Sequence, residues 1–412
     1  MGGDERRWRQ PSPPGPRPAP RPRRFLLAAF GDAGHAFPMI ALGERLAGRG
    51  HSVCLETAPR WQPHVEAAGM TFARSADYSV FPTPESPGQP YAAAVPAAEV
   101  TRALISDWRP DACVADILTV APALAAEAER LPVATLVPHI FPPSAPGFPV
   151  YSSGARLPRT RLGAALWHRA DERLMRAPLE LGREQYNASR RALGLAPSSH
   201  LHAGLSRELT LVATLPQLEY PREWPAWARV VGPLAWEPPG ERVSPPPGAG
   251  PVVLIAPSTA QDPEHSLLRA TLAGLADEPV RVIASFGGRP DFPVPGNAVL
   301  APWISYRQTM AACDAVVTHG GHGTLVRALT SGCPVLVCPA GGDMGENAAR
   351  TEWAGLGVRL PRRFLGAGSV RLGLRRLLGS PAYAERAGVV AQWAGTHDSA
   401  GAAVSELETW AG

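Results

Sequence analysis

The feature that most constrains the fold is a repeated alternation of short apolar runs with helical segments. Residues 25–30 (FLLAAF) form a continuous apolar run, which is typical of a strand buried in a parallel sheet. A helix follows, because Met39, Leu42 and Leu46 recur at helical spacing, and a second apolar run occupies residues 53–57. The pattern predicts a strand–helix–strand unit.

The same alternation recurs along the chain. Residues 112–116 and 131–137 are predicted strands, and residues 121–130 between them are a predicted helix. Alternating strands and helices predict an α/β protein with two Rossmann-like, doubly wound parallel-sheet domains. Further predicted strands lie in the C-terminal half, at residues 252–256, 280–285, 298–301, 315–318 and 335–338.

The length of 412 residues predicts two domains, because single cores rarely grow past about 250–300 residues. Two Pro-rich stretches within residues 233–250 mark the clearest linker. Residues 1–24 alternate proline with arginine, and we expect a disordered tail there. The expected domains are residues 25–232 and 251–412, and the last helix of the second could cross back to the first.

The composition excludes several functions. All 40 basic residues are arginine, so the chain cannot form a lysine Schiff base, use a lysine nucleophile or bind phosphate with a Walker lysine. Part of the net charge of +4 lies in the N-terminal tail, and we expect no nucleic-acid partner. The five cysteines form no C-x-x-C pair and are expected to be buried free thiols. With no apolar run of about 18 residues and no secretion signal, we expect a cytoplasmic protein without a membrane span.

The most informative segment is AVVTHGGHGT at residues 315–324, where a predicted strand delivers His319 into a glycine-rich turn that opens a helix. Glycines let the backbone approach a ligand closely, and the free amides at a helix N-terminus favour anions. Ligands bind at the carboxyl ends of parallel strands, so we expect a diphosphate here, with His319 and Thr324 as hydrogen-bonding groups. A tight turn that merely needs glycine is the alternative.

The next predicted strand ends in PAGGDMGENA at residues 339–348 and also leads into a helix. Its Asp343 would accept hydrogen bonds from sugar hydroxyls, and Asn347 lies one turn further on. Capping of the helix by Asp343 is the alternative, and the two roles are compatible.

Together, residues 319–348 resemble the nucleotide-sugar signature of family 1 glycosyltransferases, the inverting enzymes of GT-B fold that include actinobacterial natural-product enzymes. The resemblance implies an N-terminal acceptor-binding domain that faces a C-terminal nucleotide-sugar-binding domain across a cleft. Trp303 stands where the family stacks the nucleotide base, and Ser258 and Thr259 lie in its phosphate loop. The implied donor-binding set is Ser258, Thr259, Trp303, Ile304, His319, Gly321, Gly323, Thr324, Asp343, Met344 and Asn347.

By the same likeness, GHAFP at residues 34–38 resembles the family's N-terminal G-H-x-x-P turn, and Asp116 resembles the aspartate that orients the catalytic base. Both follow predicted strands of one sheet, so both side chains can reach one cleft. An imidazole takes a proton from an acceptor hydroxyl, and a neighbouring carboxylate fixes its tautomer. We expect His35 to be the base and Asp116 its partner. A purely structural histidine is the alternative.

Three positions depart from the family signature. Arg327 replaces a glutamate that holds ribose hydroxyls, Met344 replaces a glutamine that contacts the sugar, and Tyr306 replaces a glutamine that follows the tryptophan. Each change removes a carboxylate or a carboxamide. The donor is expected to be UDP- or TDP-linked, and a thymidine diphosphate deoxysugar is favoured over uridine diphosphate glucose.

The sequence therefore predicts an inverting glycosyltransferase of the hexosyltransferase type. No D-x-D pair and no His/Cys cluster occurs at metal-ligand spacing, so we expect it to use neither a metal ion nor another cofactor. Residues 77–100 and 138–180 are predicted to be irregular and to line a cleft for a small, apolar acceptor. The expected partners are this acceptor and the nucleotide sugar, and the chain is expected to be a monomer or a homodimer.

Two alternatives from other classes stay open. One is a nucleotide-sugar epimerase of the same fold, and the other is a non-catalytic homologue that binds nucleotide sugar. A dinucleotide dehydrogenase is disfavoured, because no G-x-G-x-x-G follows the first predicted strand.

Overall fold

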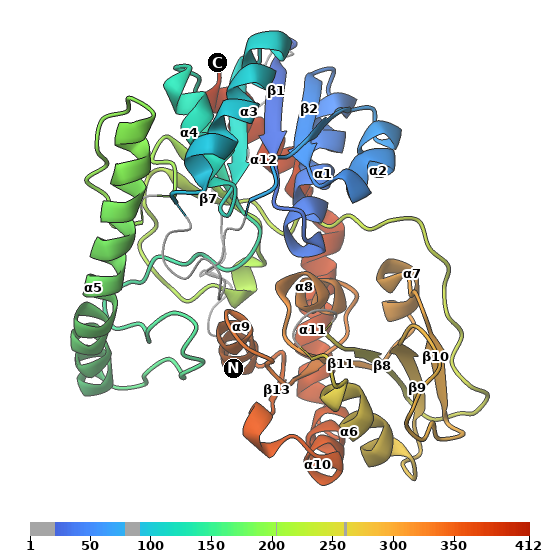
Figure 1. The fold of residues 1–412 in the computed structure, drawn as a ribbon. Helices are drawn as coiled ribbons and strands as arrows, with labels where there is room; N and C mark the ends of the chain where they lie inside the picture. Colours follow the sequence, from blue (N-terminus) through green and yellow to red (C-terminus); the bar gives the residue numbers. More distant parts are fainter. Residues whose placement is uncertain (1–20, 79–90, 203, 259–261) are drawn as a thin grey trace.

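The computed structural model describes residues 21–78, 91–202, 204–258 and 262–412, which form two α/β halves, one above the other in Figure 1. Most of the predicted N-terminal tail lies outside the described residues, and so does Thr259 of the expected donor-binding set.

The first half contains a seven-stranded sheet in which all neighbouring strands are parallel. Strands β1, β4 and β5 are buried almost throughout, which explains why they read as continuous apolar runs. The strand order is β3 (Thr71–Arg74), β2 (Ser52–Thr57), β1 (Arg24–Ala28), β4 (Ala112–Asp116), β5 (Val133–Val137), β6 (Leu209–Val212) and β7 (Ala228–Val230).

The second half contains a six-stranded sheet, again with parallel neighbours throughout. The two doubly wound sheets confirm the predicted fold class. The predicted strands agree with the structure to within two residues, but the short strands β3, β6, β7 and β13 were not predicted. The order in the second sheet is β10 (Ala298–Ala301), β9 (Arg281–Ser285), β8 (Val252–Ala256), β11 (Ala315–Thr318), β12 (Val335–Val337) and β13 (Gly357–Arg359).

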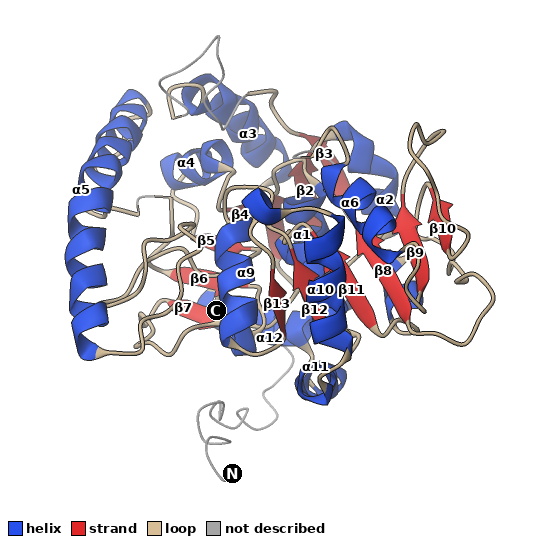
Figure 2. Ribbon diagram, turned by 90° about the horizontal axis from the view of Figure 1, so that it is seen from below, coloured by secondary structure: helices blue, strands red, loops and turns tan. Residues whose placement is uncertain are grey.

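Helices cover both faces of each sheet (Figure 2). In β1, Phe25 and Leu27 pack on the face covered by α1 and α12, whereas Leu26 packs on the face covered by α3 and α4. The helices are α1 (Ala33–Gly48), α2 (Gln62–Ala67), α3 (Ala94–Trp108), α4 (Val120–Ala128), α5 (Arg161–Ala192), α6 (Ser266–Leu275), α7 (Tyr306–Met310), α8 (His322–Thr330), α9 (Met344–Trp353), α10 (Ala367–Leu378), α11 (Pro381–Thr396) and α12 (Ser399–Trp410).

The predicted irregularity of residues 138–180 is wrong from Arg161 onward, because the 32-residue helix α5 begins there. Similarly, α3 begins at Ala94, within residues 77–100, the other segment that was predicted to be irregular. In α5, Thr160 caps the first turn by accepting a hydrogen bond from the Gly163 amide at 3.1 Å. The helix buries little of its surface, contains Pro178 and is mostly polar, so its few apolar residues were not recognised as one face of a helix.

The strand order reverses between β1 and β4 in the first sheet and between β8 and β11 in the second. Open α/β sheets bind ligands at such switch points, outside the carboxyl ends of the strands. The segments that follow these strands are therefore the places where each half can hold a ligand.

The C-terminal helix α12 packs on the first half of the chain, beside α1 (Figure 1). Its Val404 and Leu407 belong to the core of the first sheet. Glu408 accepts hydrogen bonds from Arg49 at 2.8 Å and contacts Nε2 of His51 at 3.1 Å. Conversely, the core of the second sheet includes Leu215 and Leu218, which follow β6 in the first half. Each half thus contributes residues to the core of the other.

A buried ion triad lies between the two halves. The Arg350 guanidinium on α9 donates to Glu219 of the first half at 2.7 Å and to Glu346 at 2.8 Å. All three side chains are at most 4% exposed. The guanidinium also lies 4.1 Å from the ring centroid of Tyr220. Because water is excluded from the triad, the charge of the guanidinium and the charges of the two carboxylates compensate each other.

All five cysteines are free thiols and four of them are buried, which confirms that prediction. Within the described ranges, no helix is both long and apolar enough to cross a membrane.

We predict that Arg350→Ala lowers the free energy of unfolding by about 3–5 kcal/mol, because it leaves two carboxylates buried without a cation. Denaturant-induced unfolding of the purified variant measures the loss. The control is Arg176→Ala, which breaks the exposed pair with Glu180 on α5 and is expected to leave stability unchanged. Equal stability of the two variants would contradict a stabilising role for the triad.

Candidate active site

His35 and Asp116 meet at the switch point of the first sheet. His35 is the third residue of α1, just after β1, and Asp116 is the last residue of β4. The His35 Nδ1 atom lies 2.6 Å from Asp116 Oδ2. The Leu118 amide donates to the other carboxylate oxygen, Asp116 Oδ1, at 2.7 Å. Because a carboxylate accepts, Nδ1 carries the proton and Nε2 keeps a free lone pair.

The surroundings of His35 make it a stronger base than an ordinary histidine. Burial lowers the pKa of His35, but the charge and hydrogen bond of Asp116 raise it, and the net pKa lies above 6.5. Asp32 and Asp343 raise this pKa further. The side chain keeps 18% of its surface exposed, so a ligand can still reach the ring.

A second histidine, His139, was missed by the sequence reasoning. Its ring centroid lies 6.3 Å from that of His35, and its Nδ1 donates to the Ile140 carbonyl at 2.8 Å. Burial, followed by the charge of His35, lowers the pKa of His139. The available signal was its position directly after β5, where the carboxyl ends of the strands converge.

The glycine-rich turn after β11 depends on the histidine before it. The His319 Nδ1 atom donates to the Ala256 carbonyl of β8 at 3.2 Å, which orients the ring. A Cβ atom at Gly321 would lie 2.4 Å from His319 Nε2, so only glycine fits there. Gly320 has a φ of +90°, which strains any other residue. The turn therefore places backbone atoms without a side chain directly against the His319 imidazole.

The first amides of helix α8 lack a partner within the helix. Its first intrahelical hydrogen bond runs from the Leu325 amide to the Gly321 carbonyl at 3.0 Å. The amides of His322, Gly323 and Thr324 precede that bond and have no partner within the helix. Their positive partial charges form an anion-binding end at the switch point of the second sheet.

The next helix, α9, presents Asp343 at its N-cap position. No side-chain capping bond forms, so capping is not the role of this carboxylate in the structure. Met344 is buried beside it. Asn347 is buried too, and it donates to the Gly320 carbonyl at 2.9 Å while its Oδ1 lies 3.3 Å from His322 Nδ1. Asn347 therefore stabilises the glycine turn from within.

The other predicted donor-binding residues differ in accessibility. Trp303 is 52% exposed, so its indole face is free to stack on a ring. Ile304 is buried in the core of the second half, and Ser258 is also buried. The structure thus brings Trp303, His319, Thr324 and Asp343 to one edge of the second sheet, but it turns Ile304 into the core.

The two switch points face each other, because the charge of Asp343 in the second half acts on both His35 and His139 in the first. His322, buried at the start of α8, also lies near the backbone of Ala213, which follows β6 in the first half. A base and an anion-binding helix end therefore share one space.

Arg327 and Tyr306, two positions that depart from the family signature, make contacts within the protein. The Arg327 guanidinium donates to Glu237 and to the Trp236 carbonyl of the segment between the halves. Glu237 also accepts a hydrogen bond from Ser305 at 2.6 Å. Burial raises the pKa of Tyr306 to about 12. Neither position offers a carboxylate to a ligand.

Across the described ranges, no group of three or more His, Cys, Asp or Glu side chains is placed to hold a metal ion. The groups that the structure does bring together are a histidine–carboxylate pair, glycine amides and an exposed indole.

Comparisons with known proteins indicate the class of enzyme. Residues 269–408 match the family described as Erythromycin biosynthesis protein CIII-like, C-terminal domain. The chain is 27% identical over 395 residues to 4'-demethylrebeccamycin synthase of Lentzea aerocolonigenes, covering 87% of this chain and 93% of that protein. It is 29% identical over 391 residues to O-mycaminosyltylonolide 6-deoxyallosyltransferase of Streptomyces fradiae, covering 88% and 92%. The crystal structure of the glycotransferase of kitacinnamycin superposes with a TM-score of 0.77 at 20% identity, covering 94% and 99%.

The chain is thus a glycosyltransferase of GT-B fold, which confirms the resemblance that the motifs indicated. Its residues 269–408 match the EryCIII-like C-terminal domain, which is of the family 1 glycosyltransferase type.

We predict that Asp116→Asn lowers the pKa of His35 below 6.5, because burial then acts without the charge of Asp116, which compensates it most. NMR titration of the imidazole, assigned with His35→Ala, measures this value. Asp32→Asn is the matched control, and it should lower the pKa less, since the Asp32 side chain is 66% exposed. An unchanged His35 pKa in Asp116→Asn would show that the pair is not electrostatically coupled.

Proposed function

We propose that this enzyme transfers a sugar from a nucleoside diphosphate to a hydroxyl of a small natural-product acceptor, with inversion at the anomeric carbon and without a metal ion. The observation that carries the proposal is the 2.6 Å contact between His35 and Asp116, opposite the anion-binding end of α8. The relatives support the acceptor class, since the names of two of them refer to rebeccamycin and to O-mycaminosyltylonolide.

His35 is the proposed general base. Its unprotonated Nε2 accepts the proton of the acceptor hydroxyl while the oxygen forms a bond to the anomeric carbon. Asp116 holds the ring through Nδ1 and stabilises the imidazolium that results. Because the attacking oxygen and the leaving group occupy opposite faces of the carbon, the transfer inverts the configuration.

The nucleoside diphosphate leaves with the electron pair of the broken bond. We propose that the amides of His322, Gly323 and Thr324 stabilise its negative charge, together with His319. These groups take the place of a metal cation. The remaining donor contacts are proposed for Trp303 on the base and Asp343 on the sugar hydroxyls. Met344 and Asn347 lie buried behind this surface, so we propose that they shape it.

For the donor we propose a thymidine diphosphate deoxysugar. The guanidinium of Arg327 is paired with Glu237, and Met344 is buried, so neither position provides a group for extra donor hydroxyls. The name of the Streptomyces fradiae relative includes a 6-deoxyallosyl group, which supports the deoxysugar.

For the acceptor we propose the space beside His35, in the first half. Of the aromatic residues expected there, Phe141 and Phe148 belong to buried packing. Tyr151 lies within range of the Asp343 charge. His139 and Tyr151 therefore mark the part of residues 138–180 that we assign to the acceptor site.

We predict that His35→Ala lowers kcat about 10²- to 10⁴-fold, the usual contribution of a general base, while thymidine diphosphate binding is unchanged. Transfer to a panel of hydroxyl acceptors, together with calorimetry of the nucleotide, measures both. His168→Ala, an exposed histidine on α5, is the matched control and should keep full activity.

Normal turnover in His35→Ala would remove the residue from the mechanism. The same assay with a strong chelator should keep its rate, and a rate restored only by magnesium would refute the metal-free step. Conversion of the donor without any acceptor would indicate an epimerase instead.

We predict that binding of the diphosphate takes up a proton at His319. Burial lowers the pKa of His319 below 6.5 in the free protein, so the ring is neutral, and its one proton sits on Nδ1 against Ala256. Nε2 can donate to a phosphate oxygen only after protonation. Affinity for thymidine diphosphate should therefore rise as the pH falls from about 8 to about 6, by up to about tenfold per unit.

His319→Gln is the control, because its amide donates without titrating and should flatten this slope while keeping binding. The same slope in both proteins would rule out the proton uptake. In these titrations thymidine diphosphate should bind more tightly than uridine diphosphate, and the reverse order would overturn the proposed donor class alone.

A further inference from the structure

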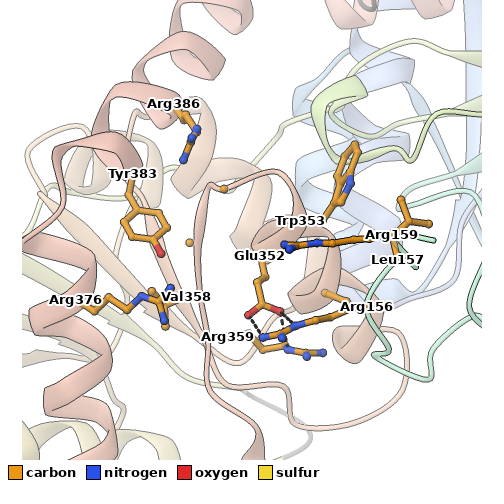
Figure 3. A pocket seen from close by; sticks show the side chains of 13 residues that line it. Arg156, Leu157, Arg159, Glu352, Trp353, Val358, Arg359, Arg376, Tyr383 and Arg386 are labelled. Carbon is orange, nitrogen blue, oxygen red and sulfur yellow. Dashed lines mark hydrogen bonds and ion pairs between the residues drawn. The ribbon is translucent and has the colours of Figure 1, made fainter. Parts of the chain in front are cut away.

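A cavity of about 570 Å³ lies away from the candidate active site. Its walls come from the segment before α5 in the first half and from α9, β13, α10 and α11 in the second (Figure 3). None of the proposed catalytic or donor-binding residues lines it. Its volume is within the usual range of small-ligand sites, about 300–1,000 Å³.

Five arginines line this cavity, against one carboxylate, so it is strongly basic. The Glu352 carboxylate is already taken, because Arg156 donates to both of its oxygens at 2.9 and 2.7 Å and Arg359 lies 3.4 Å away. Burial raises the pKa of Glu352, but these arginines outweigh it and hold the pKa below its ordinary value. The five arginines are Arg156, Arg159, Arg359, Arg376 and Arg386.

Three of these arginines form no ion pair with a described residue. In the part of the chain that the structure describes, no carboxylate lies within ion-pair distance of Arg159, Arg376 or Arg386. Figure 3 shows Arg376 and Arg386 on one side of the cavity and Arg159 on the other, with Tyr383 between the first two. Like charges that converge on one space repel each other, whereas an anion in that space would be attracted by all of them.

We propose that this basic cavity binds a compact, multiply charged anion of the polyphosphate class. The planar guanidinium group donates paired hydrogen bonds that match phosphate oxygens, and several of them around one cavity select a ligand with several charges. A partly open pocket of this size fits a small molecule, whereas nucleic acid requires an extended basic surface.

The position of the cavity gives such a ligand a structural effect. Arg156 and Arg159 belong to the first half and the other lining arginines to the second, so one anion bridges the halves. Helix α9 connects the two sites, because Met344 begins it at the candidate donor site and Glu352 lies near its other end, about 12 Å along the axis. The inference is independent of the proposed sugar transfer, since it concerns binding at other residues.

Calorimetry with inorganic tripolyphosphate at low salt tests this site. The variant Arg376→Gln/Arg386→Gln should lose one binding step or weaken it at least about tenfold, because each guanidinium–phosphate hydrogen bond contributes substantially to affinity. The control Arg169→Gln/Arg173→Gln removes the same charge from exposed positions on α5 and should bind like the parent protein.

Any tripolyphosphate bound at the glycine-rich turn contributes equally in all three proteins, so it does not affect the comparison. Equal weakening in both double variants would reduce the effect to net charge, and unchanged binding in Arg376→Gln/Arg386→Gln would refute the site. Arg159→Gln, in a loop, provides a second variant and should weaken the same step.

Discussion

The placement of the two sheets depends on Arg350, a guanidinium buried between them with Glu219 on one side and Glu346 on the other. Separate sheets have no common core, so their relative position must come from elements that cross between them. Here α12 packs into the first core, Leu215 and Leu218 pack into the second, and the ion triad lies between. A buried triad of this kind specifies one arrangement, because every other leaves charges unpaired in a dry interface.

This arrangement gives histidines in one space different proton affinities. His35 has a carboxylate partner and a pKa above 6.5, whereas burial leaves His139 and His319 below it. Titratable groups whose surroundings separate their pKa values are typical of acid–base sites. The same comparison explains why the hydrogen-bond partner of each imidazole affects its pKa more than its burial does. A carboxylate on Nδ1 stabilises the imidazolium cation, and a backbone carbonyl does so only weakly.

Much of the fold could be predicted from the sequence, because strands buried on both faces read as apolar runs. The short strands β3, β6, β7 and β13 were not predicted, because polar residues or glycine interrupt or flank their apolar residues, and α5 was not predicted because it buries only a narrow strip and contains Pro178. His35 and His319 were found because they follow predicted strands. The basic cavity could not be found, because Arg156 and Arg386 are brought together only by the packing of the two halves.

The segment between the halves illustrates how one substitution changes the role of its neighbours. With arginine at position 327, the nearby carboxylate is Glu237 of the linker, and that pair fixes the linker to α8. Trp236, the preceding residue, packs its ring 5.0 Å from Phe37 of α1. The linker is therefore held by both halves at adjacent residues. Any opening of the two halves must break the Arg327–Glu237 pair or separate Trp236 from Phe37, so this linker resists the motion that a flexible tether would allow.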